Sequence, residues 1–227
     1  MKAMILAAGL GKRMRPLTDS LPKPLLPVAD KPLIEYHIER LVAAGVGELV
    51  INHAHLGHLL EAHLGDGSRW GATIHYSREP EPLETAGGIC LALPLLGEEP
   101  FLLVNGDVWS DCPFGPLLNL TLAEGQLGHL LLVPNPGHNA GGDFDLLDGC
   151  LIRNHSAGGG YTFSGISLLH PRLLTDYPRR RQSFALREVF DYAIEQQALS
   201  GEVYHGQWWD IGTPERLQAL DRQLRAG

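Results

Sequence analysis

Basic side chains gather in the first loop of this acidic chain, at a spacing suited to binding phosphate. Lys12, Arg13, Arg15, Lys23 and Lys31 lie between positions 12 and 31, although the 227 residues carry 18 Lys and Arg against 26 Asp and Glu, for a net charge of −8. Glycines precede this cluster, and backbone N–H groups of such a loop can hold phosphate oxygens. The local reversal of charge predicts an anionic ligand, although a solvated basic loop is the simpler alternative.

This loop matches neither of two common nucleotide-binding patterns. Gly9-x-Gly11 has Met14 where a dinucleotide-binding fingerprint needs its third glycine. A P-loop would need Ser or Thr after Lys12, where Arg13 stands. The run Pro22-Lys23-Pro24 favours a functional loop, because two prolines restrict the backbone on either side of one cation.

Two carboxylates follow predicted strands and form the second chemical signal. Asp107 comes after the apolar run 101–104, and Asp210 follows Trp208-Trp209. In open parallel sheets ligands bind beyond the carboxyl ends of the strands, so both side chains are expected at one site. Either aspartate could instead cap a turn. Together with the basic loop they suggest a Mg²⁺–phosphate site, since Mg²⁺ takes one or two carboxylates and substrate phosphates.

Strands and helices alternate through the first half of the chain, which predicts a mostly parallel sheet covered on both faces. We expect an α/β fold with a doubly wound, Rossmann-like sheet in one domain, residues 1–227, in which 1–125 mainly bind nucleotide and 126–227 mainly bind sugar. Expected strands are 2–7, 48–51, 72–76, 101–104, 129–133, 144–147, 150–153, 161–169 and 208–211. Expected helices open at Pro32 and Leu56, span 85–93 with Thr85 as cap, span 187–199, and follow Thr213 as cap.

Composition excludes several classes of protein. The hydrophobic fraction of 44% argues against a disordered chain. The acidic balance argues against nucleic acid as a partner. No apolar run approaches the roughly 18 residues of a membrane span, and no signal peptide is evident, so a cytoplasmic, membrane-free monomer is expected. Cys90, Cys112 and Cys150 form no CxxC pair and are expected to be small buried side chains.

The combination of these motifs resembles a known enzyme family. Leu6-Ala7-Ala8-Gly9-x-Gly11-x-Arg13, followed by Pro16, Thr18 and Pro22-Lys23-Pro24, resembles the signature of the sugar-1-phosphate nucleotidylyltransferases. Asn105-Gly106-Asp107 and Trp209-Asp210-Ile211-Gly212-Thr213 resemble that family's two metal-binding segments, in the same order and spacing. The resemblance extends over nearly the whole chain.

The resemblance implies transfer of a nucleotidyl group from a nucleoside triphosphate to a sugar-1-phosphate, with Mg²⁺ as cofactor. It implies that Arg13 and Lys23 are catalytic: Arg13 holds the β- and γ-phosphates, and Lys23 lies between the α-phosphate and the sugar phosphate. It further implies that Gly11 and Lys12 contact the nucleotide and that Asp107 and Asp210 bind the metal. No histidine is assigned as a base, and His53, His55 and His58 are expected at the surface.

The nucleotide base is left open by the residues themselves. The resemblance implies base contacts from Ala8, Gly9, Glu79 and Gly87. An ionised Glu79 only accepts hydrogen bonds, and it could pair with uracil N3–H or with guanine N1–H and N2–H. The segment 82–88 and the short length are most similar to the branch of the family that uses UTP and N-acetylmuramate-1-phosphate; guanylyl or thymidylyl transfer to a hexose-1-phosphate is the alternative.

The sugar site is expected at Asn105, Gly142, Asn154 and Ser164, which occupy positions where the family contacts the sugar. The lactyl carboxylate of N-acetylmuramate calls for a cation, for which Arg153 and His205 are candidates, while Arg153 as a solvated surface residue is the alternative. From other functional classes, a non-catalytic sugar-nucleotide sensor is disfavoured because both catalytic cations and both aspartates are present. An NAD-binding oxidoreductase is disfavoured by the missing third glycine.

Overall fold

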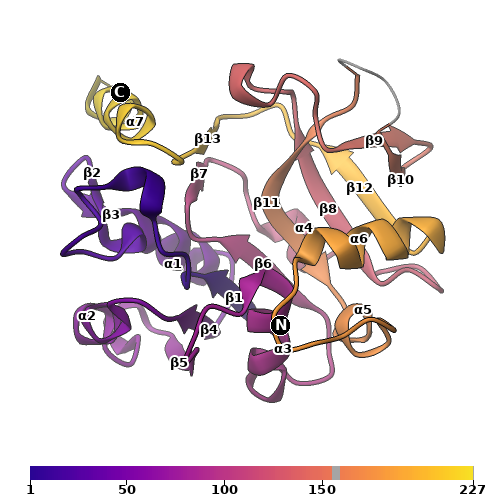
Figure 1. Ribbon diagram of the computed structural model, residues 1–227, viewed down its shortest axis with the longest axis horizontal. Helices are drawn as coiled ribbons and strands as arrows, with labels where there is room; N and C mark the ends of the chain where they lie inside the picture. Colours follow the sequence, from indigo (N-terminus) through magenta and orange to yellow (C-terminus); the bar gives the residue numbers. More distant parts are fainter. Residues whose placement is uncertain (155–158, 227) are drawn as a thin grey trace.

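A single large sheet forms the centre of the protein in the computed structural model, which describes residues 1–154 and 159–226. Among these residues, nine strands lie in the order β5-β4-β1-β6-β11-β8-β12-β10-β9 (Figure 1). Their bounds are β1 Ala3–Leu6, β4 Glu48–His53, β5 Thr73–Arg78, β6 Phe101–Asn105, β8 Gly128–Val133, β9 Phe144–Leu147, β10 Cys150–Arg153, β11 Thr162–Leu169 and β12 Leu199–Val203.

The sheet changes character where the two halves of the chain meet. β1 pairs in parallel with β4 and β6, and β4 pairs in parallel with β5. β11 then runs antiparallel to both β6 and β8, so that strands from 1–125 and 126–227 share one sheet. Because β1, β4, β5 and β6 are parallel, their carboxyl ends meet at one edge, where a ligand is expected.

Helices cover both faces of the sheet, which confirms the doubly wound α/β fold. Side chains alternate along β1. Met4 joins the core under α3 (Glu84–Leu96) and α6 (Leu186–Glu195), whereas Ile5 joins the core under α1 (Leu33–Ala43) and α2 (Gly57–Leu64). This alternation follows from the two-residue period of a strand that is buried on both faces. The helices are α1 Leu33–Ala43, α2 Gly57–Leu64, α3 Glu84–Leu96, α4 Gly115–Leu118, α5 Arg172–Thr175, α6 Leu186–Glu195 and α7 Pro214–Ala226.

Short elements outside the sheet build a third core around the first loop and the last helix. β2 (Pro27–Val28) pairs with β3 (Lys31–Pro32), and β7 (Val108–Ser110) pairs with β13 (Trp208–Asp210). Met14, Val28, Trp109, Ile211 and Leu220 are buried together between them. This core packs the basic loop and α7 against each other, as Figure 1 shows for α7 above β2 and β3.

Two expected helix boundaries were wrong. The helix expected over 187–199 ends at Glu195, and Leu199 begins β12, which pairs in parallel with β8. Ala198 and Leu199 face the same core as α6, so their apolar spacing imitates a longer helix. At α3, Thr85 lies inside the first turn, and Leu83 is the residue that precedes the helix.

Three further observations concern expectations from the sequence about membrane-spanning helices, the cysteines and His53. No helix in the described part of the chain is long and apolar enough to cross a membrane. Cys112 is buried and Cys90 is partly buried, but Cys150 is exposed, so the expectation of a buried side chain was wrong there. His53 is buried in β4, with Nε2 2.6 Å from Glu61 Oε1, and is not the surface residue that was expected.

Candidate active site

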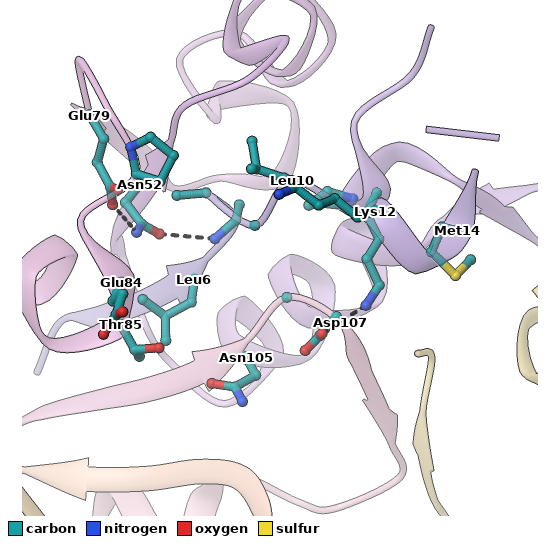
Figure 2. Close-up of a pocket in the computed structure, with 18 of the residues that line it drawn as sticks. Leu6, Leu10, Lys12, Met14, Asn52, Glu79, Glu84, Thr85, Asn105 and Asp107 are labelled. Carbon is teal, nitrogen blue, oxygen red and sulfur yellow. Dashed lines mark hydrogen bonds and ion pairs between the residues drawn. The ribbon is translucent and has the colours of Figure 1, made fainter. Parts of the chain in front are cut away.

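A cavity of about 440 Å³ opens at the carboxyl ends of the parallel strands. Figure 2 shows side chains from several separate segments around it. Most of the residues expected to bind nucleotide line it, and so do Asn105 and Asp107. The lining residues are Leu6–Met14, Lys23, Pro24, Asn52, Glu79, Pro82–Thr85, Asn105–Asp107 and Gly212.

The first loop takes its shape from Gly11 and Thr18. Gly11 has a φ of 60°, and a Cβ there would lie 2.8 Å from the Thr18 side chain. The Thr18 hydroxyl donates to the Gly11 carbonyl at 2.8 Å, and Met14 N–H donates to the same carbonyl at 2.8 Å. A Cβ on Gly9 would meet nothing within 4 Å, so a ligand can approach the backbone there.

Two cations differ in how the fold holds them. Lys23 opens a 3-10 turn (Lys23–Leu25) after Pro22, and its side chain is only 9% exposed. Its Nζ lies 2.7 Å from Asp107 Oδ2. Arg13 lies on another 3-10 turn (Lys12–Met14), is exposed, and lines the cavity. The site therefore has one fixed cation paired with a carboxylate and one cation on an exposed turn.

Asp107 and Asp210 reach the same region through the pairing of β7 with β13. Ile211 N–H donates to the Asp107 carbonyl at 2.9 Å, which joins the two segments at their ends. Asp210 Oδ2 accepts from Arg216 Nη1 at 2.5 Å and lies 3.1 Å from His138 Nε2. Sequence reasoning missed Arg216 and His138, because neither belongs to a recognisable motif.

Asp107 and Asp210 are the carboxylates that could hold Mg²⁺, although Asp210 is not among the residues that line the cavity. Among the described residues no three His, Cys, Asp or Glu side chains converge on one point. Asp107 and Asp210 both use Oδ2 for their ion pairs, so each retains Oδ1 as a ligand atom. Two carboxylate oxygens suit a Mg²⁺ ion that takes its other ligands from water and phosphate.

Helix α1 holds the strand that follows Asp107. His37 Nε2 lies 2.7 Å from the Val108 carbonyl, and Arg40 donates to the Ser110 carbonyl. A carbonyl only accepts, so the Nε2 of His37 carries the proton. His37 is 3% exposed, and burial lowers its pKa to about 4, so the ring is neutral near pH 7. A neutral buried imidazole thus fixes β7 beside the cavity.

The segment expected to contact the base is anchored by Asn52, which sequence reasoning missed. Glu79 is 6% exposed, and both of its oxygens accept hydrogen bonds from the protein: Oε1 from Asn52 Nδ2 at 2.6 Å and Oε2 from Leu83 N–H at 3.2 Å. Gly87 does not line the cavity; a Cβ there would lie 2.4 Å from the Gln182 carbonyl. The only sequence signal for Asn52 was a polar residue near the end of an apolar strand.

The structure brings only part of the expected sugar site into this cavity. Asn105 lines it, and Gly165 packs so closely that a Cβ there would lie 2.7 Å from Asn105 Nδ2. Ser164 is fully buried, and its hydroxyl accepts from Ile166 N–H at 3.1 Å. Gly142 and Asn154 do not line the cavity: Gly142 precedes β9 and Asn154 follows β10, and Asn154 Nδ2 donates to the Gly141 carbonyl at 2.5 Å.

The two candidate cations for a sugar carboxylate lie outside the cavity as well. Arg153 is exposed, and its Nη2 lies 2.5 Å from Glu195 Oε1. His205 is exposed and does not line the cavity. The contacts of Arg153 therefore favour a solvated surface residue over a ligand of the sugar carboxylate.

Comparisons with known proteins give a consistent picture. Residues 2–142 match the family described as Nucleotidyl transferase. The chain is 51% identical over 231 aligned residues to N-acetylmuramate alpha-1-phosphate uridylyltransferase of Neisseria meningitidis serogroup B, covering 100% of this chain and 99% of that protein. It is 33% identical to mannose-1-phosphate guanyltransferase of Gibberella zeae, over 95% of this chain and 62% of that protein.

A solved structure supports the fold independently of sequence. A Bacillus anthracis protein assigned as a glucose-1-phosphate thymidylyltransferase superposes with a TM-score of 0.88 at 21% identity. The superposition covers 99% of this chain and 95% of that one. The sheet and the helices on its two faces are therefore shared with a protein of low sequence similarity.

Proposed function

The chain belongs to the nucleotidyl transferase family, and from this premise we propose that it transfers the uridylyl group of UTP to N-acetylmuramate-1-phosphate. The products are UDP-N-acetylmuramate and pyrophosphate, and the reaction serves peptidoglycan recycling in the cytoplasm. The observation that carries this choice of substrates is 51% identity, over the full length, to a protein named for this reaction. The guanyltransferase relatives are 33% identical and extend well beyond this chain.

The reaction needs positioning and charge stabilisation more than acid–base chemistry. An oxygen of the sugar phosphate attacks the α-phosphorus of UTP and forms a new P–O bond. The bond from the α-phosphorus to the bridging oxygen breaks, and pyrophosphate leaves in line with the electron pair. A phosphate monoester is ionised near neutral pH, so no general base is required. The protein lowers the barrier by holding two anions in line and offsetting their repulsion.

Each charged residue has a distinct part in this mechanism. Arg13, on the exposed turn, binds the β- and γ-phosphates and stabilises the charge of the leaving pyrophosphate. Lys23 binds between the α-phosphate and the sugar phosphate; its burial and its 2.7 Å contact with Asp107 support that role. Asp107 and Asp210 would hold Mg²⁺, which would supply positive charge to offset the negative charge of the α-phosphate.

The neutral contacts set the orientation of the substrates. The open backbone at Ala8 and Gly9, with Gly11 and Lys12, receives the nucleotide from one side. Asn105 contacts the sugar at the cavity. Gly142 and Asn154, which lie before β9 and after β10, are proposed to contact the part of the sugar that extends beyond the cavity. Ser164 supports this region from its buried position.

A matrix of substrates tests this proposal. Purified protein is assayed for Mg²⁺-dependent pyrophosphate release with UTP, GTP, dTTP and ATP, each combined with the 1-phosphates of N-acetylmuramate, N-acetylglucosamine, glucose and mannose. UTP with N-acetylmuramate-1-phosphate is expected to give the highest kcat/KM. A preference for GTP with mannose-1-phosphate would contradict the choice of substrates but not the reaction class. Absence of pyrophosphate release with every pair would contradict both.

A further inference from the structure

A relay of hydrogen bonds joins the two walls of the proposed base-binding cleft. Asn52, near the end of β4 and 2% exposed, accepts from Ala7 N–H through Oδ1 at 2.9 Å and donates through Nδ2 to Glu79 Oε1 at 2.6 Å. Glu79 Oε2 accepts from Leu83 N–H at 3.2 Å. Figure 2 shows Asn52 between Glu79 and the first loop. We refer to these contacts as the Asn52–Glu79 relay.

Glu79 lines the cavity, and both of its carboxylate oxygens are bonded to the protein. A Cβ on Gly88 would lie 2.4 Å from Glu79 Oε1 and 2.9 Å from Asn52 Nδ2, so α3 closes over the contact. An ionised carboxylate only accepts hydrogen bonds, and each oxygen of Glu79 already has a protein donor. The carboxylate therefore holds the side-chain amide of Asn52 and the backbone N–H of Leu83.

Leu83 is held from its other side as well. Phe184 N–H donates to the Leu83 carbonyl at 3.2 Å, while Ala86 N–H donates to the Phe184 carbonyl at 3.1 Å. Leu83 lines the cavity and directly precedes α3. The N–H of Leu83 is thus bonded to Glu79 and its carbonyl to Phe184. Loss of the Glu79 bond would release the N–H but not the carbonyl.

We propose that the Asn52–Glu79 relay sets the spacing between the Ala7–Gly9 wall and the Pro82–Thr85 wall of the base-binding cleft. Asn52 and Glu79 are then positioning residues, which act on the nucleotide through Ala7 and Leu83 without touching the base. This inference rests on the proposed function, because the cleft is the base site only if the chain binds a nucleoside triphosphate there. If this inference holds, the affinity for UTP depends on the order of hydrogen-bond donors and acceptors along the relay.

Reversal of that order is the sharpest test. In Glu79→Gln, the new side-chain NH₂ faces Leu83 N–H in one orientation. In the other orientation it faces Asn52, which must then either oppose it with its own NH₂ or turn that NH₂ toward Ala7 N–H. Two donors therefore face each other in every arrangement, and one buried donor lacks its acceptor. Asn52→Asp sets two carboxylates against each other. The double variant Asn52→Asp/Glu79→Gln restores every bond: the new aspartate accepts from Ala7 N–H and from the new glutamine, whose oxygen accepts from Leu83 N–H. Each substitution is nearly isosteric, and the double variant keeps the net charge of the pair.

Binding of UTP with Mg²⁺ is measured by calorimetry without a sugar phosphate, so that the result does not depend on turnover. Each single variant is expected to weaken binding roughly tenfold or more, the scale of one unsatisfied buried group, and the double variant to return within about threefold of wild type. The ranking of UTP, GTP and dTTP by affinity should stay unchanged in every variant.

KM for UTP should rise in the single variants with little change in kcat. Glu81→Gln, an exposed position in the same segment, is the matched control and should bind like wild type.

Amide hydrogen exchange at Ala7 and Leu83 gives a second readout that needs no nucleotide. At least one of these amides is expected to exchange faster in Glu79→Gln, and both are expected to be protected in the double variant. A double variant that binds no better than Glu79→Gln would overturn the relay. A changed ranking of nucleotides in Glu79→Gln would overturn it too, because Glu79 would then contact the base. Failure of the proposed function would appear in wild type as absence of turnover, whereas failure of this inference would appear only in the variants.

Discussion

The ammonium group of Lys23 lies 2.7 Å from Asp107 Oδ2, although 84 positions separate the two residues. The lysine side chain is 9% exposed and the aspartate 42% exposed, so the cation is fixed while the carboxylate opens to the cavity. The turn between Pro22 and Pro24 thus places the positive group of Lys23 beside the negative group of Asp107, which follows β6. In the proposed reaction the first meets phosphate and the second meets the metal.

Replacement of Lys23 tests whether this cation is catalytic. Lys23→Met should lower kcat by roughly 10²–10³-fold, the scale observed when one preorganised electrostatic contact to a transition state is removed. Steady-state pyrophosphate release is the measurement. Lys31→Met removes an equal charge from a surface pair with Glu39 and serves as the control, with activity close to wild type. Wild-type turnover by Lys23→Met would make the lysine a structural partner of Asp107 only.

The metal assignment predicts a shift in Mg²⁺ dependence. Asp107→Asn and Asp210→Asn should each raise the Mg²⁺ concentration for half-maximal activity by roughly tenfold or more, because an anionic ligand oxygen is lost. Titration of activity with Mg²⁺ measures this, with Asp148→Asn in an exposed turn as the control. Turnover that persists undiminished in a chelator would remove the metal from the mechanism altogether.

The close approach of β1 and β6 predicts a strict requirement for glycine at position 106. A Cβ on Gly106 would lie 2.5 Å from the Leu6 carbonyl oxygen, which also accepts the Gly106 N–H at 2.8 Å. Gly106→Ala should destabilise the fold by about 1–3 kcal/mol, because backbone must shift to admit the methyl group. Urea unfolding measures the change. Gly47→Ala, where a Cβ meets nothing within 4 Å, is the matched control, and equal midpoints for the two variants would contradict the prediction.

The position of the candidate cavity could be predicted from the sequence because ligands bind at the carboxyl ends of parallel strands. Apolar runs before Asn105-Gly106-Asp107 and before the first glycines predicted two strands of a parallel sheet, and ligands bind beyond such ends. The structure places these two strands side by side. The cavity indeed lies at their ends, with Arg13, Lys23 and Glu79 around it. The burial of these strands on both faces was equally predictable, because each is a continuous apolar run.

What sequence could not supply was the long-range pairing of polar groups. Asn52 lies 27 positions from Glu79, and His138 meets Asp210 only because the fold brings their loops together. Polar residues near strand ends are common, so nothing marked Asn52 beforehand. The residue type of Glu79 was visible in the sequence, but the donors bonded to it, Asn52 Nδ2 and Leu83 N–H, were not. β12 was hidden because Leu199 continues an apolar pattern that belongs to α6.

Burial of His37 predicts that the fold weakens in mild acid. The folded-state pKa is about 4, lowered chiefly by burial, whereas an unfolded chain has a histidine pKa near 6.5. Between these values the unfolded chain binds a proton that the folded chain does not, so unfolding becomes easier as pH falls from about 6.5 to about 4. Above that window the contribution is constant, and below it both states are protonated.

The size of this effect follows from the two pKa values. Lowering the pH from 7 to 5 should remove about 2 kcal/mol of unfolding free energy through His37 alone. His37→Gln keeps an N–H for the Val108 carbonyl but cannot take up a proton, so its stability should depend less on pH by that amount. Urea unfolding of both proteins at pH 7 and pH 5 isolates the difference, because all other titrating groups are shared. His58→Gln, at an exposed position of α2, should retain the wild-type dependence. Parallel losses in wild type and His37→Gln would show that the buried imidazole is not the group that responds to acid.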